Sequence, residues 1–154
     1  MRSEFIQPFV DALVKVLEQS TGQPVKRGAV GVKSSPIATM GVASIIGITG
    51  SSEGRAVLDM SRETACSLAG AMSGEPAGSY DAMVSSTINE LNNMVCGQAV
   101  SALVNRGLRM DINPPTLFTG HDMDITNSGM EIVTIPVETR HGPVLLNLSL
   151  RSKS

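Results

Sequence analysis

The sequence predicts an α+β fold in which helices pack against a largely antiparallel β-sheet. Apolar residues recur at helical spacing in three segments, of which residues 79–107 form the longest. Between and after these segments lie two groups of runs that are rich in Val and Ile or alternate between apolar and polar residues, as strands do. With 154 residues, 42% of them apolar, the chain is expected to fold as one domain over residues 1–154.

The first half of the chain is expected to hold a helix, a group of strands and a second helix. Apolar residues repeat at helical spacing over residues 3–20, where Ser3 is a suitable N-cap and Pro8 requires a kink or a later start. Ser61 is suited to cap a shorter helix over residues 62–72. Strands are expected in three runs between the two helices: residues 25–33, 39–49 and 54–60.

The second half is expected to open with the long helix and to close with a β-hairpin. The helix over residues 79–107 follows a loop that contains Gly and Pro, and it ends at a glycine, as helices commonly do. Pro114 and Pro115 forbid helix in the connector that follows, over residues 108–115. A short strand and the two strands of the hairpin are expected at residues 116–120, 130–139 and 143–150.

The long helix carries an unusual group of residues on its polar side. Counted at 100° per residue from Glu90, Ser86 falls at about −40°, Asn93 at about −60° and Gly97 at about −20°. A carboxylate and a carboxamide are therefore aligned one turn apart, beside a glycine that lets another surface approach closely. The opposite side, between about 120° and 180°, is apolar and holds Val84, Ile88, Val95, Ala99 and Ala102.

Charge and hydropathy exclude several classes of protein. The net charge is −2 and the basic residues are scattered, so nucleic-acid binding is not expected. The longest strongly apolar stretch, residues 40–49, is too short to span a bilayer, and the N-terminus lacks the pattern of a signal peptide. No membrane association is therefore expected, and the cytoplasm is the expected location.

Metal and redox sites are not expected either. Cys66 and Cys96 lie in separate helix candidates without a C-x-x-C spacing, so both are expected to be small buried apolar residues. His121, Asp122 and Asp124 lie close together in the sequence, but such a group is common on surface loops. No metal or other cofactor is therefore expected to be bound by this chain.

The polar face of the long helix resembles a known signature. Ser86, three residues, Glu90, two residues, Asn93, twenty-one residues and Pro115 match the pattern of the CheC/CheX family of chemotaxis phosphatases. Residues 89–97 look like the active-site helix of that family. The opening helix, the glycine-broken strands and the closing hairpin are similar to CheX as well.

The number of copies of the signature separates the two branches of the family. Members similar to CheC carry it twice, once in each half. Here the first helix offers Asp11, Lys15 and Glu18 at the corresponding spacing, which lacks both the Glu and the Asn. The chain therefore resembles CheX, whose members are homodimers, and the resemblance implies one site in each of two protomers.

The resemblance implies hydrolysis of the aspartyl phosphate on a phosphorylated response regulator of the CheY type. Catalysis of such a transfer rests on positioning and charge stabilisation rather than on covalent chemistry. The Mg²⁺ that neutralises phosphate charge would then be held by the response regulator.

Each residue of the signature has an expected role in this reaction. Asn93 can orient a water in line with the phosphorus, because a carboxamide both donates and accepts hydrogen bonds. Glu90 is expected to accept a charge-assisted hydrogen bond from a Lys of the response regulator and so to fix the docking register. Ser86 is placed to bond the Glu90 carboxylate or the partner's backbone. Gly97 admits the partner closely, whereas Pro115 shapes the connector.

Two other functions are compatible with the same residues. The chain could be a binding module that docks a receiver domain without hydrolysing its phosphate, or a purely structural dimerisation domain. A Glu and an Asn three residues apart are usually just solvated. However, a solvated face normally carries pairs of Lys and Glu rather than Ser, Asn and Gly, which favours a functional face. The phosphatase is the leading hypothesis, and the effect of Asn93→Ala on activity distinguishes it from the docking module.

Overall fold

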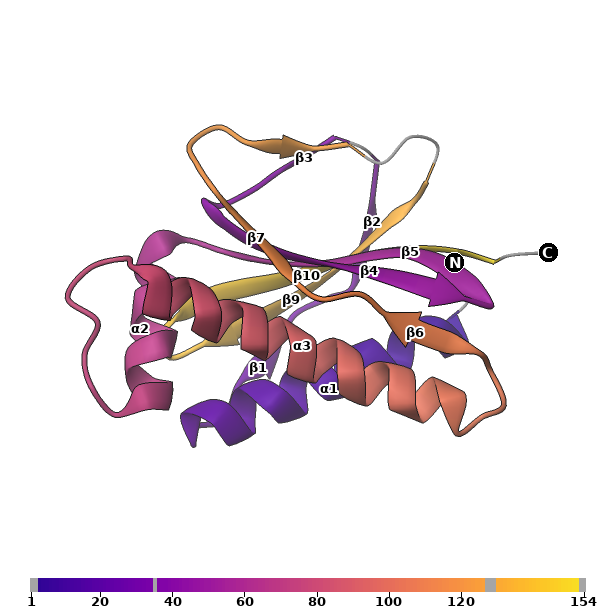
Figure 1. Ribbon diagram of the computed structural model, residues 1–154, viewed down its shortest axis with the longest axis horizontal. Helices are drawn as coiled ribbons and strands as arrows, with labels where there is room; N and C mark the ends of the chain where they lie inside the picture. Colours follow the sequence, from indigo (N-terminus) through magenta and orange to yellow (C-terminus); the bar gives the residue numbers. More distant parts are fainter. Residues whose placement is uncertain (1–2, 35, 127–129, 153–154) are drawn as a thin grey trace.

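The structure, a computed structural model, describes residues 3–34, 36–126 and 130–152. Within these residues, helices pack on one face of an eight-stranded sheet in which every pairing is antiparallel, so the predicted α+β fold is confirmed (Figure 1). The helices are α1 (Ser3–Thr21), α2 (Arg62–Ser73) and α3 (Ala82–Val104). The strands are β1 (Lys26–Arg27), β2 (Gly31–Lys33), β3 (Ile37–Ala38), β4 (Val42–Gly50), β5 (Ser52–Met60), β6 (Met110–Ile112), β7 (Thr116–Thr119), β8 (Asp124–Ile125), β9 (Ile132–Thr139) and β10 (Gly142–Ser152).

The sheet is built around two long hairpins. Its strands run in the order β1-β9-β10-β5-β4-β6, with β2 also pairing with β9 and β7 also pairing with β4. Ser44, in the middle of β4, lies opposite Leu58 of β5 on one side and Leu117 of β7 on the other. The strand that carries Ser44 is therefore held on both edges at the place where α3 crosses it.

The two long helices lie together beneath the sheet and form the core with it (Figure 1). The apolar stripe of α1 includes Phe9, Leu13 and Leu17, none of which has any exposed surface. The stripe of α3 is buried in the same core, against inward-facing residues of β4, β5, β9 and β10. Burying a side chain of this size stabilises the fold by roughly 1.5–3 kcal/mol. The packing of these side chains therefore determines which side of α3 faces solvent.

The other face of the sheet is crossed by the small ribbon of β3 and β8 (Figure 1). Ile37 and Ile125 of this ribbon lie opposite each other and line a small cavity with Val57 and Ile132 of the sheet. No helix in the described part of the chain combines the length and the apolar character needed to cross a membrane.

The long helix is shorter than the sequence predicts. The expected start near Ser79 is wrong: α3 begins at Ala82 because the side chain of Asp81 accepts the backbone N–H of Val84 at 3.0 Å. At the other end α3 stops at Val104, and Gly107, with φ +91°, then turns the chain away. Both ends differ from the prediction by three residues, a shift that leaves the polar face unchanged.

Other elements are close to their predictions, with differences where pairing partners are distant in the sequence. Ser61 caps α2 as expected, because its hydroxyl accepts the N–H of Thr64 at 3.1 Å. Helix α1 continues through Pro8, which is buried within it. The run over residues 25–33 is two short strands rather than one, joined where the N–H of Gly28 bonds the carbonyl of Pro136 at 2.8 Å.

A buried carboxyl on the ribbon side of the sheet gives the fold a pH dependence. Asp59 has no exposed surface, its carboxylate accepts the N–H of Met40 at 3.0 Å, and burial raises its pKa to about 6. Because the pKa is higher in the folded chain than in the unfolded one, protonated Asp59 stabilises the fold at low pH. This stabilisation is lost as the pH rises from about 4 through about 6.

We therefore expect Asp59→Asn to become stabilising relative to wild type as the pH increases. The difference in free energy of unfolding should be near zero at pH 4 and should reach about 1–3 kcal/mol at pH 7.5. Urea unfolding at several pH values measures it. A difference that does not change between these two pH values would contradict the assignment.

Candidate functional site

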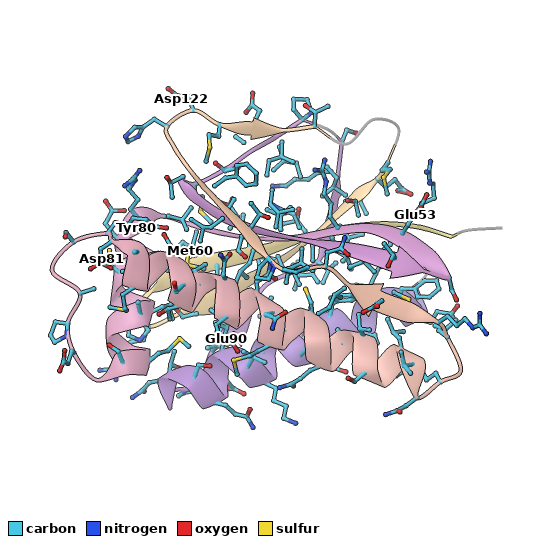
Figure 2. All side chains as sticks on the ribbon, viewed as in Figure 1. Glu53, Met60, Tyr80, Asp81, Glu90 and Asp122 are labelled. Atoms are coloured by element: carbon cyan, nitrogen blue, oxygen red, sulfur yellow. The ribbon has the colours of Figure 1, made fainter. Side chains whose placement is uncertain are left out.

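The polar face predicted for the long helix is accessible to solvent in the structure. Ser86 and Glu90 are exposed, and Asn93 and Gly97 are half-buried. Figure 2 shows Glu90 on the side of α3 that is turned away from the sheet. Glu90 and Asn93 are separated by about 4.5 Å along the helix axis. The structure therefore brings the four predicted helix residues onto one accessible surface.

The N-terminal end of α3, which leads into this surface, is fixed by side chains. Tyr80 and Ser85 share a hydrogen bond of 2.7 Å between their hydroxyl groups. The guanidinium of Arg62, at the start of α2, lies 5.2 Å from the centre of the Tyr80 ring. Through Tyr80, these contacts tie the first turn of α3 to α2, directly before Ser86.

Gly97 has open space above it. A Cβ placed on this residue would meet no atom within 4 Å outside the helix's own backbone. Its lack of a side chain is therefore not required by packing within this chain, although Gly lowers the stability of a helix interior by about 1 kcal/mol relative to Ala. This combination fits the predicted close approach of a partner.

We expect Gly97→Ala to separate stability from binding. The free energy of unfolding of the variant should be about 0.5–1 kcal/mol higher than that of wild type, because Ala favours helix and its Cβ meets no atom outside the helix's own backbone. Its affinity for a phosphorylated receiver should fall several-fold, as measured by titration calorimetry. Unchanged affinity would remove Gly97 from the docking surface.

Pro115 lies off the helix, at the entry to β7. The connector before it is held to the sheet, because the N–H of Asn113 bonds the carbonyl of Gly47 at 2.9 Å. The next residue, Thr116, pairs with Ile45 of β4. Pro115 thus sits beside the strand that α3 covers, and a role in shaping the connector stays a prediction.

A polar network beneath the site was not predicted from the sequence. The hydroxyl of Ser44 donates to Oδ1 of Asn89 at 2.8 Å. Nδ2 of Asn92 donates to the carbonyl and the hydroxyl of Ser44, at 2.9 Å and 3.2 Å. The thiol of Cys96 donates to Oδ1 of Asn92 at 3.4 Å. Ser44 and Asn92 have no exposed surface, so this network joins α3 to β4 inside an otherwise apolar interface.

One signal in the sequence points to this network. Asn92 falls at about 200° from Glu90, at the border of the apolar side of the helix. A carboxamide at a core position requires a hydrogen-bond partner. The periodicity identifies the position but not the partner, because Ser44 is 48 residues away in the sequence.

The described residues do not form a metal centre. Among them, no group of three or more His, Cys, Asp or Glu side chains is arranged to hold a metal ion. Cys96 is buried, and burial raises the pKa of its thiol to about 12, which keeps it protonated. Cys66 is half-buried rather than buried as expected, and burial also raises its pKa.

The proposed site lies on an accessible helix face, away from three cavities of the described residues. Cavities of about 350, 560 and 620 Å³ lie against the β3–β8 ribbon and α2, and their linings include no residue of α3. A small substrate would gain little burial on an open helix face. A macromolecular partner that brings its own reacting group suits such a surface better.

Comparison with known proteins identifies the family. The family profile described as "Chemotaxis phosphatase CheX" matches residues 42–138, which include all of α3 and Pro115. A Thermotoga maritima protein, named CheY-P phosphatase CheX, is 33% identical over 122 residues, which cover 79% of this chain and 74% of that protein.

Solved structures are similar over nearly the whole chain. A CheC-like superfamily protein from Shewanella sp. PV-4 has a TM-score of 0.90 and 26% identity, over 99% of this chain and 100% of that one. The CheX–CheY–BeF₃–Mg²⁺ complex from Borrelia burgdorferi contains a chain with a TM-score of 0.83 and 32% identity, over 96% of this chain and 98% of that one. With a family profile matching most of its length and a curated relative at this level of identity, the chain belongs to the CheX family of chemotaxis phosphatases.

Proposed function

We propose that this chain hydrolyses the aspartyl phosphate of a phosphorylated response regulator of the CheY type. The observation that carries the proposal is the exposed face of α3, where Glu90 and Asn93 lie one turn apart inside the region that matches CheX. The Thermotoga relative is named a CheY-P phosphatase, and the Borrelia relative was solved in complex with CheY. Both names support a receiver domain as the partner.

The reaction needs little from this chain beyond positioning. A water oxygen attacks the phosphorus as the bond from phosphorus to the aspartyl oxygen breaks, which yields inorganic phosphate and the free carboxylate. The carboxamide of Asn93 can hold this water in line, because its oxygen can accept a hydrogen bond from the water and its NH₂ group can donate one to the water or to the phosphoryl group. Asn93 does not act as a base, because a loose transition state does not require one.

Glu90 and its neighbours would set the docking geometry. Its exposed carboxylate is available to a Lys of the receiver, and such a charge-assisted bond fixes register and orientation. Ser86 lies one turn earlier on the same face and can bond that carboxylate or the receiver's backbone. Gly97 leaves room for the partner on the other side of Asn93.

The metal in this reaction would belong to the receiver. The described residues of this chain offer no metal-binding group of their own, and the Borrelia complex contains Mg²⁺ together with CheY. The ion bound to the receiver would neutralise charge on the phosphoryl oxygens. The chain itself would then need no cofactor.

Decay of a phosphorylated CheY-type receiver, with and without this chain, tests the proposal. Phosphatase activity predicts faster release of phosphate at catalytic amounts of the chain. Binding without acceleration would instead support the receiver-docking module, and neither binding nor acceleration with the cognate receiver would refute both.

We also propose that the chain acts in the cytoplasm as a homodimer, as the resemblance to CheX implies. The edge strand β2 supports self-association, because Val32 is 65% exposed there. Sedimentation velocity is expected to show a species of twice the chain mass, and a monomer at high concentration would contradict the dimer.

A further inference from the structure

Glu90 and Asn93, the two residues proposed to act on the receiver, each directly follow an asparagine whose side chain is hydrogen-bonded to Ser44. Asn89 precedes Glu90, and Asn92 precedes Asn93. Ser44 of β4 is therefore hydrogen-bonded to the side chains of both asparagines, through its hydroxyl and its backbone carbonyl. This link connects the sheet to the helix directly behind the proposed site.

The network is satisfied in only one orientation of the helix. The Ser44 hydroxyl donates to Asn89 and accepts from Asn92, while the carboxamide of Asn92 uses both its nitrogen and its oxygen. If α3 rotated or slid on the sheet, the buried polar groups of Ser44 and Asn92 would lose their hydrogen-bond partners, which is costly in the interior of a protein. Apolar contacts alone are not directional and would tolerate such a movement.

A small rotation of α3 would matter for the reaction. Side-chain ends lie about 5–6 Å from the axis of a helix, so a turn of about 10° moves them by about 1 Å. Displacements of about 1 Å can lower the rate of a positioned reaction by about a hundredfold. The affinity of the docking surface is less sensitive to the same movement, because side chains at an interface can change rotamer to keep their contacts, whereas the in-line geometry of the attack has no such freedom.

We propose that Ser44, Asn89 and Asn92 form a positioning network that sets the orientation of Glu90 and Asn93 for hydrolysis. None of the three needs to touch the substrate, and all act through the orientation of α3. This inference rests on the proposed phosphatase function and extends it to residues outside the CheX signature.

The test compares Ser44→Ala with two matched variants in the assay of receiver dephosphorylation. Ser44→Thr keeps the hydroxyl in a strand, where a β-branched residue is favoured. Thr134→Val removes a hydroxyl from a second buried pair, because Thr134 donates to Oδ1 of Asn147 at 2.8 Å. That pair joins β9 to β10 rather than β4 to α3 and so controls for a general loss of stability.

We expect Ser44→Ala to lower kcat at least tenfold with KM within threefold of wild type, whereas Ser44→Thr and Thr134→Val stay within threefold in both constants. Asn89→Ala, at a half-buried position, is expected to lower kcat in the same way and serves if Ser44→Ala does not fold.

Three results would overturn the inference: an equal fall of kcat in Thr134→Val, an increase of KM alone in Ser44→Ala and Asn89→Ala, or unchanged kinetics in these two variants. A wild-type chain that does not accelerate dephosphorylation would refute the proposed function itself. An active wild type paired with an unaffected Ser44→Ala variant would refute only the positioning role.

Discussion

Replacing Asn93 by Ala is expected to abolish dephosphorylation of the receiver, with a fall in kcat of about a hundredfold or more. The lost carboxamide acts on the attacking water and on charge that develops in the transition state, so its removal should affect the chemical step. Affinity for the phosphorylated receiver should stay within about threefold, because Glu90 and the rest of the helix face remain. The rate of phosphate release and titration of the receiver measure the two effects separately.

The fold is not expected to explain this loss. Asn93 is half-buried in the middle of α3, and Ala has a higher helix propensity than Asn. Gln98→Ala is a matched control, since Gln98 is exposed on the same helix but outside the signature. The control should keep wild-type kinetics. If Asn93→Ala lost binding together with activity, the assignment of Asn93 to the water would be wrong.

The sequence predicts well which residues lie on the polar face of α3, because that face depends on local geometry. The positions of Ser86, Glu90, Asn93 and Gly97 around the helix follow from its period alone, and the structure leaves all four accessible. The ends of the helix were predicted less well. Asp81 is the N-cap of α3, and the position of a cap depends on which side chain reaches the free N–H groups.

The features that sequence analysis missed depend on contacts between distant residues. β6 and β8 are three and two residues long, too short for any periodicity, and they exist because β4 and β3 offer free edges to them. The bond between Asn92 and Ser44 is equally non-local. The two prolines correctly place Pro115 in the connector after the helix, but nothing local in the sequence indicates that this connector lies beside β4.

Replacing Glu90 by Gln is expected to weaken docking of the phosphorylated receiver by about tenfold or more. A charge-assisted hydrogen bond contributes about 1.5–3 kcal/mol, and Gln keeps the shape and an acceptor but removes the charge. Because Glu and Gln have similar helix propensities, α3 should be unaffected. Titration of the receiver at low and high salt measures the effect, which should shrink as salt screens the charges.

Glu75→Gln provides the matched control for this experiment. Glu75 is exposed in the loop between α2 and α3, so its substitution makes the same change in net charge outside the proposed docking face. If the receiver were attracted only by the overall electrostatic field of the chain, both variants would weaken binding equally. If Glu90 instead bonds a Lys of the receiver, only Glu90→Gln should weaken binding, and replacement of that Lys should remove the difference between wild type and variant. Equal affinities for wild type and Glu90→Gln at low salt would exclude Glu90 from the docking contact and leave Asn93 as the principal residue of the site.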